Sequence, residues 1–132
     1  MEDLQRILII DDDEVASFIA ELQIKSSHPG CLIQTIKNGE DALELLLQQH
    51  PANRLPHLIL LDLHMPLMDG LEFLVEMKKL QLSPCPKVVV LTSSLCKKEQ
   101  QSILHSGADG FFQKPITQES MQQILQLALK KP

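Results

Sequence analysis

The stretch "LILLDLHMPLMDG", residues 58–70, decides the fold and raises the first question about function. It begins with four aliphatic residues, 58–61, and a run that is apolar at every position is typical of a strand in a parallel sheet covered on both faces. The run ends in a charged residue, Asp62. Because a buried carboxylate is costly unless it is paired or bound to a metal, Asp62 needs partners from elsewhere in the chain.

Apolar runs and helical patterns alternate along the whole chain. Five runs have the length and composition of strands: 6–10, 31–36, 58–61, 87–91 and 110–113. Hydrophobic residues recur at helical spacing after these runs. The first such set is Val15, Phe18, Ile19 and Leu22. With right-handed crossovers, this series predicts an α/β fold, a doubly wound five-stranded parallel sheet with five helices on both faces.

Cap and turn residues mark where the predicted helices begin and end. Asp13, Asn38 and Thr117 each precede a helical pattern. Their side-chain oxygens can accept hydrogen bonds from the first free N–H groups of a helix, so each is predicted to be a cap. Gly107 is predicted to end the fourth helix.

Hydrophobic spacing also predicts which side chains of the helices face the core. In the helix that follows Gly70, the residues expected to point inward are Leu71, Leu74 and Val75. The leucine-rich segment 43–47 is expected to belong to the core rather than to a groove for a partner. In the last helix the inward residues are expected to be Met121, Ile124, Leu125 and Ala128.

Composition restricts the classes of protein that fit. The 132 residues suit one folded domain, residues 1–132, with 44% hydrophobic and 22% charged residues. The net charge is −5 and no long basic run occurs, which disfavours direct binding to nucleic acid. Three cysteines without CxxC spacing argue against a disulfide framework and a zinc site. No apolar run approaches the roughly 18 residues of a membrane span, so we expect a cytoplasmic protein without membrane insertion.

Polar residues follow four of the five predicted strands. They are Asp11, Asp12 and Asp13 after the first, Asp62 after the third, Thr92, Ser93 and Ser94 after the fourth, and Lys114 after the fifth. The carboxyl ends of parallel strands meet at one edge of a doubly wound sheet, where functional groups gather. The partners that Asp62 requires are therefore expected at this edge.

The residue types at this edge indicate a particular chemistry. Several acids brought together repel one another, and a hard divalent cation with oxygen ligands, Mg²⁺, relieves that repulsion. Lys114 adds a fixed positive charge and Thr92 a hydroxyl. A carboxylate beside Mg²⁺, an ammonium and a hydroxyl is suited to attack phosphorus in line, so the chemistry predicted for Asp62 is formation of an aspartyl phosphate.

Four segments together carry a resemblance to a known family. They are ILIIDDD (7–13), LLDLHMPLMDG (60–70), VVLTSS (89–94) and FFQKPI (111–116). In this order and at these spacings the chain resembles the receiver domain of two-component response regulators, of the stand-alone chemotaxis-regulator type. The resemblance covers essentially the whole chain and implies a flavodoxin-like fold with strand order 2-1-3-4-5.

The resemblance implies a role for each matching residue at the site. Asp62 would be the phosphoacceptor, taking a phosphoryl group from the phosphohistidine of a sensor histidine kinase or phosphotransfer protein. Asp11 and Asp12 would hold Mg²⁺ together with Asp62 and the backbone carbonyl of His64. Lys114 would contact the phosphoryl group and Asp62. The chain would then be a signalling protein that takes part in its own phosphorylation, rather than an enzyme with a separate substrate.

Two residues are expected to transmit the effect of phosphorylation from Asp62 to the surface of the domain. Thr92 would bond to the phosphoryl oxygen, and Phe111 would change rotamer as Thr92 moves. The family often has Tyr at this position, so Phe111 keeps the ring without the hydroxyl, and plain core packing is an equally good interpretation of it. The side chains of His64 and Ser94 occupy positions that tune phosphoryl hydrolysis in such receivers.

The output surface is expected on the fourth helix, the fifth strand and the fifth helix, where a downstream protein target would bind; a homodimer is also possible. Two other functions stay open. One is a degenerate receiver that binds partners without phosphorylation. The other is a small Mg²⁺-dependent phosphatase with an aspartyl-phosphate intermediate, which would need a second acid where His64 stands.

Overall fold

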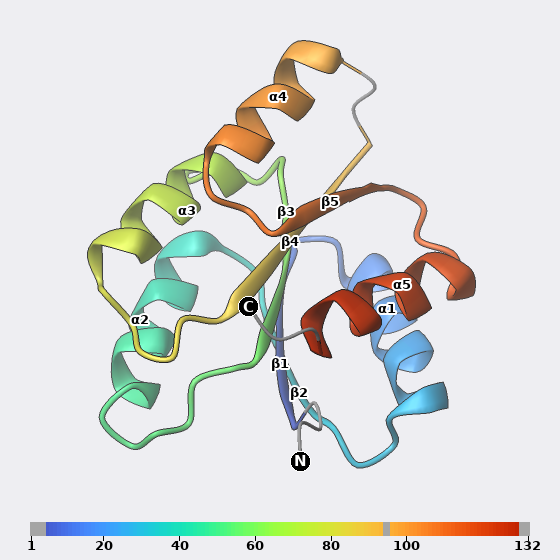
Figure 1. The fold of residues 1–132 in the computed structure, drawn as a ribbon, viewed down its shortest axis with the longest axis horizontal. Helices are drawn as coiled ribbons and strands as arrows, with labels where there is room; N and C mark the ends of the chain where they lie inside the picture. Colours follow the sequence, from blue (N-terminus) through green and yellow to red (C-terminus); the bar gives the residue numbers. More distant parts are fainter. Residues whose placement is uncertain (1–4, 94–95, 130–132) are drawn as a thin grey trace.

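A five-stranded parallel sheet between two layers of helices forms the computed structural model of the protein, which describes residues 5–93 and 96–129 (Figure 1). The strands are β1 (Arg6–Ile10), β2 (Leu32–Ile36), β3 (Leu58–Asp62), β4 (Lys87–Thr92) and β5 (Gly110–Gln113). Their order is β2-β1-β3-β4-β5, and each pairing is parallel. The predicted fold class and strand order are confirmed.

The helices divide between the two faces of the sheet (Figure 1). They are α1 (Glu14–Ser27), α2 (Gly39–Gln49), α3 (Gly70–Lys79), α4 (Lys97–His105) and α5 (Gln118–Leu129). Helices α2, α3 and α4 contribute to the core on one face, and α1 and α5 to the core on the other. In the described ranges, no helix is both long and apolar enough to cross a membrane.

The position of β3 in the middle of the sheet explains the unbroken apolar run in its sequence. Every residue of the strand is buried. Ile59 and Leu61 belong to the core under α2, α3 and α4, whereas Leu58 and Leu60 belong to the core under α1 and α5. Since side chains alternate between the faces of a strand, the four positions 58–61, which lie between two cores, are all hydrophobic.

The predicted caps are confirmed. The Asp13 carboxylate accepts hydrogen bonds from the backbone N–H groups of Val15 and Ala16, at 3.0 and 3.2 Å. Asn38 caps α2 through the N–H of Asp41 at 2.8 Å. The Thr117 hydroxyl accepts a hydrogen bond from the N–H of Ser120 at 3.0 Å. Gly107, with φ +94°, directly follows Ser106, the C-cap of α4, and ends the helix as predicted.

Helix α1 is correctly predicted, but its apolar stripe faces solvent. We define the α1 stripe as Val15, Phe18, Ile19 and Leu22. The exposed fractions of these side chains run from 46% for Ile19 to 67% for Val15. The buried positions of α1 are instead Ser17, Ala20 and Ile24. The spacing therefore indicates the helix correctly without indicating which of its faces meets the sheet.

The predicted orientation of Val75 in α3 is wrong. Val75 is 52% exposed, and the buried positions of the helix are Gly70, Phe73, Leu74 and Met77. Leu74 is buried as predicted and Leu71 is partly buried. Both candidate faces have helical spacing, and the face that includes Phe73 and Met77 removes more apolar area from water.

The leucine-rich segment 43–47 of α2 is divided between core and surface. Leu46 is fully buried, and Leu43 and Leu45 pack at the margin of the core. Leu47 is 53% exposed. In α5 the prediction is confirmed: Met121, Ile124 and Leu125 are buried and Ala128 packs against them.

Gly70 begins α3 where the backbone passes close to the end of β3. Its N–H donates to the carbonyl of Leu63 at 2.9 Å. A Cβ at this position would lie 2.9 Å from the carbonyl oxygen of Asp62 and 3.0 Å from Leu63 Cα. Both neighbours are backbone atoms, so the contact cannot be relieved by turning a side chain.

We expect Gly70→Ala to lower the free energy of unfolding by about 1–3 kcal/mol, because the added methyl group must displace backbone. Urea unfolding followed by circular dichroism measures this change. Gly30→Ala is the matched control: a Cβ there meets nothing within 4 Å, and its effect should stay within about 0.5 kcal/mol. Equal stabilities of the two variants would contradict the prediction.

Candidate functional site

The strand ends bring the predicted polar residues to one edge of the sheet. Asp11 directly follows β1, Asp62 and Thr92 are the last residues of β3 and β4, and Lys114 directly follows β5. Backbone hydrogen bonds continue the pairing past the strand ends: Lys114 N–H donates to the Thr92 carbonyl at 2.8 Å, and Leu63 N–H to that of Leu91 at 3.0 Å. The positions of these side chains thus follow from strand order and register.

Three carboxylates form a cluster at this edge. One oxygen from each of Asp11, Asp12 and Asp62 lies within 4.8 Å of the other two. Asp11 and Asp62 are buried, while Asp12 is exposed, so the cluster is open to solvent on the side of Asp12. Carboxylate oxygens are the donors that Mg²⁺ prefers, so the donor set fits a hard divalent cation.

Lys114 is the cation that this structure places against the buried acids. Its Nζ lies 2.9 Å from Asp11 Oδ2 and 3.3 Å from Asp62 Oδ1. Burial lowers the pKa of Lys114, but the hydrogen bond and charge of Asp11, followed by those of Asp62, outweigh it, and the pKa lies above its ordinary value. The ammonium is therefore charged at neutral pH and offsets part of the negative charge.

The environment of Asp62 favours its neutral form. Burial, followed by the negative charge of Asp11, raises its pKa from 3.8 to about 6, although Lys114 and the backbone N–H of His64 act in the opposite direction. Ionisation of Asp62 therefore lowers the free energy of unfolding of the protein. Any added positive charge would reduce that cost.

The raised pKa of Asp62 gives a pH-dependent stability. Between about pH 4 and 6 the folded state binds more protons at this group than the unfolded state, so stability falls as the pH rises. Asp62→Asn removes this cost. We expect it to raise the free energy of unfolding by about 1–3 kcal/mol at pH 7.5 in EDTA, and by less at pH 4.

Urea unfolding at the two pH values tests this expectation. Asp12→Asn, which removes an exposed carboxylate from the same cluster, should change stability less. An Asp62→Asn variant that is no more stable than the wild type at pH 7.5 would contradict it.

The remaining predicted residues take several places around the cluster. The side chain of Asp13 caps α1, and its backbone N–H donates a hydrogen bond to Asp11 Oδ1 at 2.9 Å. Thr92 is buried, with 1% of its surface exposed. Phe111 is partly buried against the core under α2, α3 and α4, so the structure gives it a packing role. Ser94 lies outside the described residues.

Sequence reasoning missed a contact of the His64 side chain. The imidazole is largely exposed, and its Nε2 lies 3.4 Å from Glu99 Oε1 on α4. These residues belong to different β/α units, and no spacing rule connects them. The contact becomes visible only when β4 and its following helix are placed beside β3.

Comparison with known proteins identifies the class to which this fold and cluster belong. The sequence model of the response regulator receiver domain family matches residues 7–126, and the chain belongs to this family. It is therefore a receiver domain of two-component signal transduction.

Individual relatives agree with this assignment. The chain is 28% identical over 121 residues to the probable C4-dicarboxylate response regulator DctR of Bacillus subtilis, covering 92% of this chain and 50% of that protein. It is 27% identical over 120 residues to the two-component response regulator ORR41 of Oryza sativa, covering 91% of each. The Mn²⁺-bound form of response regulator Rcp1 is similar with a TM-score of 0.75 and 27% identity, over 93% of this chain and 91% of that one. The chain thus spans half of one relative and nearly all of another.

Proposed function

We propose that Asp62 accepts a phosphoryl group from the phosphohistidine of a sensor histidine kinase or phosphotransfer protein, in an Mg²⁺-dependent reaction. The observation that carries this proposal is the position of Asp62, buried at the end of the central strand within reach of two further carboxylates and an ammonium. We further propose that residues 1–132 form a single receiver domain that acts in the cytoplasm. Its partners would be proteins rather than nucleic acid or membranes.

The proposed transfer breaks the P–N bond of the phosphohistidine and forms a P–O bond to a carboxylate oxygen of Asp62. The electron pair of the P–N bond stays on the imidazole. Lys114, whose Nζ already lies 3.3 Å from Asp62, would hold an oxygen of the phosphoryl group. The hydroxyl of Thr92, from the end of the neighbouring strand, would hydrogen-bond to another.

The metal proposed for the site is Mg²⁺. Asp11, Asp12, Asp62 and the backbone carbonyl of His64 would hold it. When bound, Mg²⁺ supplies positive charge that offsets the charge of the phosphoryl oxygens. Support comes from the close carboxylates, from the raised pKa of Asp62, and from the similar protein Rcp1, whose structure was determined with Mn²⁺ bound.

A phosphoryl group on Asp62 would change the surface formed by α4, β5 and α5. It adds negative charge and strong acceptors beside Lys114 and Thr92. These two residues are joined by a backbone hydrogen bond across the ends of β4 and β5, so a shift of one is passed to the other. Phe111 of β5 would change rotamer as Thr92 moves, and a downstream protein would recognise the altered surface.

The mass of the intact protein after incubation with acetyl phosphate tests the proposal. We expect a labile gain of one phosphoryl group that requires both Mg²⁺ and Asp62, so that EDTA or Asp62→Asn abolishes it. Glu119→Gln, an exposed acid in the first turn of α5, is the control and should be phosphorylated like the wild type.

Some receivers do not react with small donors, so a negative result leads to a second assay with beryllofluoride, which mimics the phosphoryl group. No gain of mass with acetyl phosphate, together with no change in the NMR spectrum on adding beryllofluoride, would overturn the proposal. The chain would then be a binding module that works without phosphorylation. Phosphate release from an added phosphomonoester would instead favour the phosphatase, for which His64 stands where a second acid is needed.

The α1 stripe offers a docking surface for the phosphodonor. A groove of about 370 Å³ is lined by Val15 and Ile19 of the stripe and also by Asp11 and Lys114 of the site. Exposed apolar surface that continues into a reactive site suits a protein that must bind and then place its phosphohistidine beside Asp62. We therefore include this face in the proposed donor interface.

We expect Phe18→Ala to slow phosphoryl transfer from a histidine phosphotransfer protein about tenfold, because an exposed aromatic anchor is lost. Phosphorylation by acetyl phosphate, which needs no protein interface, should be unchanged. Transfer rates are measured with a radiolabelled donor protein. Leu104→Ala removes a similarly exposed apolar side chain from α4 and should not affect transfer; an equal loss in both variants would contradict the prediction.

A further inference from the structure

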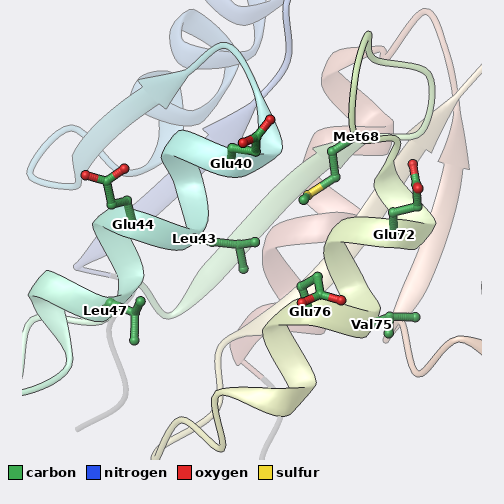
Figure 2. A pocket seen from close by; sticks show the side chains of 8 residues that line it. All are labelled: Glu40, Leu43, Glu44, Leu47, Met68, Glu72, Val75 and Glu76. Carbon is green, nitrogen blue, oxygen red and sulfur yellow. The ribbon is translucent and has the colours of Figure 1, made fainter.

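A second groove lies on the opposite side of the sheet from α1, between α2 and α3 (Figure 2). Its volume is about 590 Å³, and it includes none of the residues assigned to phosphoryl transfer. We call it the acidic groove. Its lining combines apolar side chains with glutamates, and no lysine or arginine of the described residues contributes to it.

The apolar part of the acidic groove comes from both helices and the loop before α3. It consists of Leu43, Leu47, Met68 and Val75. Figure 2 shows Leu43 extending from α2 into the space between the helices, with Met68 above it. Leu47 and Val75 are each about half exposed, at 53% and 52%. These are two of the residues expected in the core, and their exposure leaves apolar surface that a partner could cover.

Four glutamates surround this apolar surface. Glu40 and Glu44 are one turn apart on α2, and Glu72 and Glu76 are one turn apart on α3. Glu40 and Glu72 lie in first turns, where negative charge stabilises a helix. Glu44 and Glu76 lie one turn further along, where that benefit is gone, so helix stability does not explain all four.

The glutamates of α2 carry most of the unneutralised charge. Glu76 pairs with Lys79 at 3.0 Å, and Glu72 accepts a hydrogen bond from the Asp69 N–H at 3.0 Å. For Glu40 and Glu44, no ion pair or side-chain hydrogen bond occurs within residues 5–93 and 96–129. The exposed carboxylates of Glu40 and Glu44, which lie on the same helix as the exposed Leu47, are therefore available to a cationic partner.

We propose that the acidic groove binds a cationic amphipathic helix of a partner protein. An amphipathic helix lays apolar residues into a groove at spacings of three and four, as Leu43 and Val75 would receive them. Lysine or arginine at the margins of that helix would face Glu40 and Glu44. The segment from Glu40 to Leu47 rises about 10 Å, so two to three turns of a partner helix would cover it.

The negative charge of the acidic groove favours a cationic helix over a second copy of the chain, nucleic acid or an anionic membrane. A two-fold dimer through this face would place the glutamates of one copy against those of the other, and like charges across an interface are costly. Nucleic acid and anionic membrane surfaces would be repelled for the same reason. The proposal does not depend on phosphorylation of Asp62, since the groove and the carboxylate cluster share no residue.

The probe for the test is a synthetic helical peptide of leucine and lysine, 14 residues long, with leucines at helical spacing so that one face is apolar. Amide chemical shifts of the isotope-labelled protein are followed during titration. We expect shifts concentrated in α2 and α3. The double variant Glu40→Gln/Glu44→Gln should weaken binding about tenfold, and Leu47→Gln should also weaken it.

Glu21→Gln/Glu119→Gln is the matched control, because it removes two acids from α1 and α5 and leaves the groove intact. Its affinity should equal that of the wild type, and a peptide of the same composition in scrambled order should bind more weakly. Circular dichroism of each variant verifies that the fold is unchanged.

Four results would each overturn the proposal. They are no binding, an equal loss of affinity in both double variants, chemical shift changes centred on the α1 stripe instead of α2 and α3, and a concentration-dependent dimer that Leu47→Gln abolishes. The last result would assign the groove to a second copy of the chain.

Discussion

The electrostatic balance at the end of β3 is the constraint on which the site depends. Asp11 and Asp62 are both buried and repel one another, and Lys114 reaches both carboxylates at 2.9 and 3.3 Å. Burial, followed by the negative charge of Asp11, raises the pKa of Asp62 to about 6, and the single ammonium of Lys114 offsets this only in part. The fold thus holds an arrangement that additional positive charge would stabilise.

Three separate strands must meet for this balance to exist. Asp62 is the last residue of the central strand, and Asp11 and Lys114 directly follow β1 and β5. Alternate residues of β3 belong to different cores, so a change in its register would move Asp62 and expose hydrophobic residues at once. The rigid sheet therefore fixes the distances between the charges, whereas the chemistry resides in side chains at its edge.

The sequence predicts the strands, the caps and the residues of the carboxylate cluster because these depend on local patterns. A short, continuous apolar run bounded by turn residues favours a strand with cores on both faces, and an acid that directly follows such a strand lies at the edge of the sheet. The rotation of a helix about its axis is different. In α3 two apolar faces compete, and Phe73 lies on the buried one while Val75 lies outside. In α1 the smaller residues Ser17 and Ala20 face the sheet and Phe18 faces solvent, which composition alone does not predict. The contact between His64 and Glu99 joins two β/α units, so no local pattern contains it.

The division of the helices between the two faces of the sheet has a steric consequence. The α1 stripe lies on one face with α5, and the groove between α2 and α3 lies on the other, with the whole thickness of the sheet between them (Figure 1). If both proposed interfaces are used, two partner proteins would approach the molecule from opposite faces of the sheet and would not compete for the same residues.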